Sequence, residues 1–105
     1  MKKIQDLTSS EELVMKSVWD LQKEAVLSEI TDHVNNNYRE EAWRPQTVST
    51  FLAKLVNKGY LKLQRNGKIY TYKVLVTEEQ YRKKLLNHML HFWYQGDVDK
   101  MVEEI

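Results

Sequence analysis

Seven basic side chains and no acidic one lie between residues 44 and 76. They are Arg44, Lys54, Lys58, Lys62, Arg65, Lys68 and Lys73. The formal net charge of the whole chain is only +1, because the acids are concentrated before and after this segment. A positive surface on one folded unit is typical of proteins that bind a polyanion, and nucleic acid is the first candidate.

Residues 45–58 place part of this charge on a predicted helix. Apolar side chains recur there at intervals of three and four residues and predict one buried face: Val48, Phe51, Leu52, Leu55 and Val56. The opposite face carries small polar groups followed by cations: Gln46, Thr47, Ser49, Thr50, Ala53, Lys54, Asn57 and Lys58. Short hydroxyl and amide groups let a helix enter the major groove and address base edges, while the lysines suit phosphate or guanine. An ordinary solvated helix face is the alternative, but such a face normally mixes both signs of charge.

The turn at residues 65–68 is the second candidate contact. Residues 60–64 and 69–74 alternate or are rich in aromatic and β-branched side chains, and Asn66-Gly67 between them favours a tight hairpin turn. Arg65 and Lys68 flank that turn and can reach a backbone phosphate or the minor groove. The alternative is a charged hairpin tip that serves only solubility.

The remaining elements are predicted to be helical. A helix over 7–22 begins with Ser9 and Glu12 in a capping box, and a second helix begins at Ser28 and ends at 35–37. The helix that starts near Pro45 ends before Gly59. Thr77 caps a long helix that runs to about residue 94, and a short helix follows over 97–105.

This order of elements predicts a mainly α fold with a small β-hairpin, a winged helix-turn-helix followed by C-terminal dimerisation helices. We expect residues 1–76 to form the winged-helix DNA-binding domain and residues 77–105 the helical dimerisation segment. The long helix is apolar around most of its circumference after Leu85, and such a helix must be buried on more than one side. The predicted dimer interface consists of Leu85, Leu86, Met89, Leu90, Phe92 and Trp93. Burial of this helix within a single subunit is the alternative.

Other classes of function find little support in the sequence. The chain has no cysteine, which excludes disulfides, zinc–thiolate sites and cysteine nucleophiles. His88 and His91 have a spacing that can hold a metal, but their apolar neighbours favour an interface, so no metal or cofactor is predicted. No nucleophile or paired carboxylate stands in a known catalytic motif, so the protein is not predicted to be an enzyme. Without a signal peptide or membrane-spanning run, it is expected to be cytoplasmic.

With these residues in hand, the chain resembles the BlaI/MecI/CopY family of bacterial repressors. The matching motifs are Glu12-Leu13-Val14-Met15, Val18-Trp19, Trp43-x-Pro45-x-Thr47-Val48-x-Thr50-x-Leu52-x-Lys54-Leu55-x-x-Lys58-Gly59-Tyr60-Leu61, Arg65-x-Gly67-Lys68 and Tyr70-x-Tyr72. The resemblance implies a homodimeric repressor whose third helix reads the major groove of a palindrome with TACA/TGTA half-sites. Its C-terminal helices would form the dimer.

The sequence departs from the family pattern in three places. Arg44 replaces the small capping residue of many members, so the start of this helix is expected to be less well capped and to gain a phosphate contact. The Cys-x-Cys motif of the copper-responsive members is absent. Antibiotic-responsive members are cleaved by a sensor metalloprotease near a segment that resembles residues 101–105, where Glu104-Ile105 stands in place of their Asn-Phe pair. The chain also stops where members usually continue, so a truncated chain and a short natural form are both open.

The leading hypothesis is therefore a DNA-binding repressor that uses double-stranded DNA and a second copy of itself as partners, with a sensor metalloprotease as a further partner. The predicted DNA contacts are Arg44, Gln46, Thr47, Thr50, Lys54, Lys58, Arg65 and Lys68. The competing hypothesis is a winged-helix protein-interaction module without DNA binding, which predicts acids or apolar residues on the exposed face of the third helix.

Overall fold

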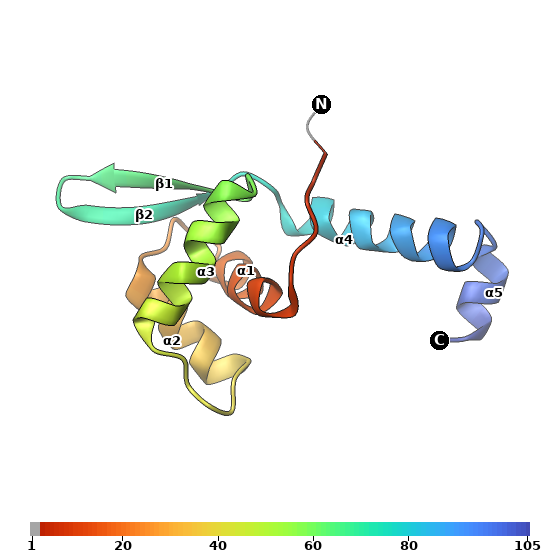
Figure 1. Ribbon diagram of the computed structural model, residues 1–105, viewed down its shortest axis with the longest axis horizontal. Helices are drawn as coiled ribbons and strands as arrows, with labels where there is room; N and C mark the ends of the chain where they lie inside the picture. The colour runs from red at the N-terminus through yellow and green to blue at the C-terminus, as the bar shows by residue number, and fades with distance from the viewer. Residues whose placement is uncertain (1–2) are drawn as a thin grey trace.

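The computed structural model describes residues 3–105. The elements are α1 (Ser9–Leu21), α2 (Leu27–Asn37), α3 (Pro45–Asn57), β1 (Leu61–Asn66), β2 (Ile69–Val74), α4 (Glu78–His88), the π-helical turn η1 (Met89–Trp93) and α5 (Val98–Glu103). Helices α1–α3 and the hairpin form one body, from which α4 projects with α5 at its far end (Figure 1). The predicted order of helices and strands is confirmed. Within residues 3–105, each helix is too short or too polar to cross a bilayer.

The starts of α1 and α2 correct the predicted caps. Thr8, not Ser9, is the N-cap of α1: its hydroxyl accepts from the Glu11 N–H, and Glu11 accepts from the Thr8 N–H at 2.8 Å. The prediction was wrong by one residue because Glu11, not Glu12, turns back onto the cap. The N-cap of α2 is Val26, two residues before the predicted Ser28, and the Glu29 carboxylate accepts from the N–H of Val26 at 3.1 Å.

The boundaries of α3 are those predicted, with Pro45 in its first turn and Gly59 just beyond its end at φ +82°. The hairpin differs slightly. Asn66 pairs with Ile69, so the two loop residues are Gly67 and Lys68 rather than Asn66 and Gly67. Gly67 has φ +68° at the first loop position, where a type II′ turn places glycine.

One hydrophobic core joins the three helices, the hairpin and the start of α4. Its fully buried members include Val14, Met15 and Val18 from α1, Ile30 and Val34 from α2, Val48, Leu52 and Leu55 from α3, and Tyr60 and Leu61 after it. Tyr81 of α4 is only 5% exposed and packs against Trp19 and Tyr60, with ring centroids 5.7 and 5.9 Å away. The first turns of α4 therefore pack as part of the body, beyond residue 76.

Candidate nucleic-acid interface

Helix α3 presents its predicted polar face to solvent. Val48, Leu52 and Leu55 point into the core, and Gln46 and Thr50 are exposed on the other side, with Thr47 half-buried. Arg44 is the N-cap residue and makes no side-chain capping hydrogen bond. Because the first turn contains no acid, the positive end of the helix dipole is uncompensated, which favours an anion there.

The hydrogen bond that the Thr50 hydroxyl makes within α3 limits the groups of a nucleic acid that this hydroxyl could contact. Its hydroxyl donates to the carbonyl oxygen of Gln46 at 3.0 Å, one turn earlier in the helix. With its single hydrogen used in this way, the hydroxyl can only accept from a ligand. The base-edge groups that donate in the major groove are the amino groups of adenine and cytosine.

Lys54 lies along an aromatic pair at the surface of α3. Its Nζ is 5.6 Å from the centre of the Phe51 ring, and that ring packs on Trp43 with centroids 5.1 Å apart. The Arg39 guanidinium lies over the Trp43 ring, 4.3 Å from its centre. Arg39 thus adds a cation near the start of α3 that the sequence did not predict as a contact.

Lys58 occupies a different environment from the rest of the predicted set. Its Nζ is 2.6 Å from Oε1 of Glu11 and donates to the Asp6 carbonyl oxygen at 2.9 Å. Glu11 is only 1% exposed. Burial alone would raise the pKa of Glu11, but hydrogen bonds from Lys58 and from Thr8 together hold this pKa below its ordinary value. The structure therefore directs the Lys58 ammonium inward and separates it from the open face of α3.

The hairpin carries cations at its tip and along one face. Arg65 donates through Nε to the Gly67 carbonyl oxygen at 2.7 Å, and its guanidinium lies 5.6 Å from the centre of the Tyr70 ring. Lys68 is exposed in the loop. Lys62 and Lys73 stand directly opposite each other on β1 and β2, and neither has a carboxylate within 4.0 Å among residues 3–105. Like charges that face each other across two strands are destabilising. The sequence did not predict this pair, because it depends on the register of the two strands.

No group of three or more potential metal ligands occurs within residues 3–105. His88 is exposed and stacks on Phe92 with ring centroids 5.0 Å apart. His33 instead lies in the body, with Nε2 3.1 Å from Oδ2 of Asp20. These placements give His88 a packing role and His33 a hydrogen-bonding role.

The projecting helix exposes the apolar side chains that were predicted to form a dimer interface. Leu85, Leu86, Met89, Phe92 and Trp93 are between 44 and 63% exposed, and Leu90 is half-buried. We call this set, from Leu85 to Trp93, the arm surface. Val98 and Val102 of α5 are exposed as well. Contiguous apolar patches of this kind mark interaction sites, since monomeric proteins rarely leave them open.

Comparison with known proteins gives concordant matches over nearly the whole chain. The family model described as penicillinase repressor matches residues 7–105. The penicillinase repressor of Bacillus licheniformis is 28% identical over 105 residues, which cover 97% of this chain and 77% of that protein. The methicillin resistance regulatory protein MecI of Staphylococcus aureus (strain N315) is 26% identical over 100 residues, which cover 95% of this chain and 78% of that protein.

Solved structures show the same relationship. The solution structure of monomeric B. licheniformis BlaI in complex with the blaP half-operator superimposes with a TM-score of 0.60 and 28% identity. This match covers 77% of the present chain and 94% of that one, and the solution structure of the BlaI DNA-binding domain matches equally well. The predicted winged helix-turn-helix is therefore confirmed.

Proposed function

The chain belongs to the penicillinase repressor family, and we propose that this DNA-binding repressor acts in the cytoplasm as a homodimer on a palindromic operator. The family consists of transcriptional repressors and not enzymes. The observation that carries the proposal is the exposed face of α3, which is free of acids and lies beside a cationic hairpin. TACA/TGTA half-sites are the sequence that the family resemblance implies.

We assign the contacts by position on α3 and the hairpin. Gln46, Thr47 and Thr50 would read base edges, because they are short and polar and lie in the first turns of α3. The proposed phosphate contacts are the exposed cations Arg44, Lys54, Arg65 and Lys68. Lys58 is left out, because its ammonium is engaged by the buried carboxylate of Glu11.

The arm surface supports the homodimer. A two-fold axis through two such surfaces would bury apolar side chains that the single chain leaves exposed. It would also present two copies of α3 to half-sites about one helical turn apart. Inactivation by a sensor metalloprotease is the inducing route that the resemblance implies, and cleavage near α5 would weaken the same dimer.

The protein-interaction alternative has less support. A module that binds protein through α3 would need acids or large apolar side chains on its exposed face. Within α3, no acid occurs and no large apolar side chain is fully exposed.

We predict that the protein binds a TACA/TGTA palindrome at least about 10³-fold more tightly than a scrambled duplex at the same salt concentration. Titration of labelled duplexes measures both affinities. Repeating it over a range of salt should give a slope of log K against log[salt] of about −0.9 for each phosphate contact. Equal affinity for the two duplexes would contradict the repressor proposal.

Thr50 and Lys68 are expected to act separately. Thr50→Ala should cost roughly 1–3 kcal/mol of binding free energy at the cognate site and relax discrimination at one base pair. Lys68→Ala should weaken all duplexes alike and reduce the salt slope by about one. Lys83→Ala removes a cation from α4, where among residues 3–105 its one carboxylate partner is Glu79 at 3.1 Å, and should leave both quantities unchanged. The reverse pattern for Thr50 and Lys68 would show that helix and wing roles are misassigned.

A further inference from the structure

We infer that Lys16 fixes the direction of α4 relative to the winged-helix body and thereby determines which half-site spacing the dimer accepts. This inference rests on the proposed homodimer, since spacing has meaning only when two reading helices bind together. Lys16 lies on α1, away from the proposed DNA contacts, so it would be a positioning residue.

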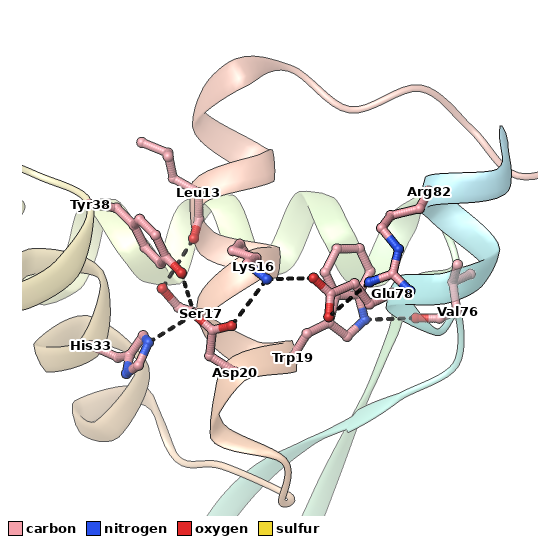
Figure 2. Close-up of polar contacts among 10 residues, drawn as sticks. All are labelled: Leu13, Lys16, Ser17, Trp19, Asp20, His33, Tyr38, Val76, Glu78 and Arg82. Atoms are coloured by element: carbon pink, nitrogen blue, oxygen red, sulfur yellow. Dashed lines mark hydrogen bonds and ion pairs between the residues drawn. The ribbon is translucent and has the colours of Figure 1, made fainter. Parts of the chain in front are cut away.

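Lys16 sits between two carboxylates from different elements (Figure 2). Its Nζ is 2.5 Å from Oε2 of Glu78, the first residue of α4, and 3.3 Å from Oδ1 of Asp20 on α1. The hydrogen bond to Glu78 is the main cause that raises the pKa of Lys16 above its ordinary value. Glu78 also pairs with Arg82 within α4 at 3.7 Å, and Asp20 also binds His33 and Tyr38. Removal of Lys16 would therefore leave each carboxylate with partners on its own side and take away the ammonium that joins α1 to α4 through Glu78.

Asp20 also makes polar contacts with residues of α2 and its C-terminal end. His33 lies 3.1 Å from Oδ2 of Asp20, and the Tyr38 hydroxyl donates to the same oxygen (Figure 2). Burial alone would raise the pKa of Asp20, but hydrogen bonds from Tyr38, His33 and Lys16 hold it below its ordinary value. The helix-turn-helix and α4 are thus joined by a continuous polar chain in which Lys16 is the cation between α1 and α4.

Two aromatic side chains, Trp19 and Tyr81, hold the base of α4, and the Tyr81 hydroxyl also donates to Glu12 of α1. The Trp19 Nε1–H donates to the Val76 carbonyl oxygen at 3.0 Å, and Trp19 packs on Tyr81. These contacts lie close together around the first turns of α4, where they form a pivot. The Lys16–Glu78 pair acts beside that pivot, and a second contact joins Lys84 to Asp6 in the segment before α1.

Small rotations at this pivot become large at the arm surface. Helix α4 and η1 run from Glu78 to Trp93 and project from the body (Figure 1). From Tyr81 at the pivot to Trp93, a helical rise of 1.5 Å per residue gives a length of roughly 18 Å. A tilt of roughly 10° then moves the end by about 3 Å, comparable with the 3.4 Å rise of one base pair. The direction of α4 therefore controls the spacing between two reading helices at single-base-pair resolution.

The test compares Lys16→Met with the parent in the full chain. Affinities are measured for a single half-site, for the preferred palindrome and for palindromes lengthened or shortened by one base pair. We expect half-site affinity to stay within about twofold and palindrome affinity to fall about tenfold, part of the gain that tethering provides. We also expect the preference among spacings to flatten. Lys83→Met, which removes an exposed ammonium paired with Glu79 of the same helix, should behave like the parent.

A second measurement reports the geometry directly. The chain has no cysteine, so Asn66→Cys allows one spin label at each wing tip of a dimer. In the Lys16→Met background the distance between the two labels should shift or broaden. An unchanged spacing preference and label distance would overturn the inference while leaving the proposed function intact, and an equal loss at the half-site would overturn it in favour of a folding role. A parent without preference for a palindrome over a half-site would overturn both.

Discussion

Replacing Leu86 and Phe92 together by Glu is expected to lower affinity for the palindromic operator by about 10²–10⁴-fold. The two side chains are 59 and 63% exposed on the arm surface, so the body should remain folded. Burying a carboxylate in an apolar interface without a partner is costly, and the dimer should therefore dissociate. Each reading helix would then bind a half-site without the effective concentration that tethering supplies.

Sedimentation should show a monomer for this double variant, while its affinity for a single half-site stays close to that of the parent. The control is Asn87→Glu with His91→Glu, which adds the same number of glutamates. Helical spacing puts these two exposed residues opposite the arm surface. That control should bind the palindrome almost normally. Full palindrome affinity in a monomeric Leu86→Glu, Phe92→Glu variant would refute the homodimer proposal.

These substitutions test the arm more cleanly than removal of residues 77–105. Such a deletion would take away Tyr81, which is 5% exposed and packs against Trp19 and Tyr60 in the core. It would also remove Glu78, the partner of Lys16. Loss of operator affinity would then report damage to the body as well as loss of the dimer.

The parts of the fold that the sequence predicted are those governed by local chemistry. The apolar stripe of α3, Pro45 at its start and Gly59 after its end depend on residues a few positions apart. Thr77 and Gln80 likewise form a cap through neighbours, with the Gln80 N–H 3.1 Å from Oγ1 of Thr77. Periodicity and capping rules act over such distances, so they place both ends of α3 and the start of α4 correctly. The same rules placed the caps of α1 and α2 one and two residues too late, because neighbouring Ser and Thr residues offer competing caps.

Contacts between distant segments explain what the sequence did not reveal. Lys58 follows the spacing of an exposed α3 cation, yet it binds Glu11, 47 residues earlier in the chain. Glu11 and Glu12 each follow a Thr or Ser by three residues, so the capping pattern does not separate them. Glu11 lies on the same face of α1 as the buried Val14 and Val18, and the packing of α3 on α1 brings Lys58 to it. The pairing of Lys62 with Lys73 similarly depends on how β1 and β2 are aligned. A shift of one residue in this register would place the two lysines opposite other residues.

Lys58→Met is expected to lower the free energy of unfolding by about 3 kcal/mol at neutral pH, because it leaves the Glu11 carboxylate buried without its cation. Glu11 is only 1% exposed and is 2.6 Å from the ammonium that would be lost. Methionine retains most of the apolar stem, so the change removes chiefly the charge. Glu11 would still accept a hydrogen bond from the Thr8 N–H, so the loss of stability should lie at the lower end of the range for a broken buried ion pair.

The loss should depend on pH in a defined direction. In the parent the pKa of Glu11 lies below its ordinary 4.5, so its stabilising contribution is complete above that value and disappears as pH falls through the lower folded-state pKa. Without Lys58, burial would dominate and raise the pKa of Glu11 above its ordinary value. The variant would then bind its proton at a higher pH than the parent, and the stability gap should narrow as pH falls below that raised pKa.

Urea unfolding at neutral pH and near pH 4.5 measures this gap, with Lys54→Met as the matched control. Lys54 is exposed on the same helix and has no carboxylate partner within 4.0 Å among residues 3–105, so its loss should weaken DNA binding and leave stability nearly unchanged. Adding Glu11→Gln to Lys58→Met should restore most of the lost stability, since the amide oxygen can still accept from the Thr8 N–H. A stable Lys58→Met variant with impaired DNA binding would instead place Lys58 among the phosphate contacts.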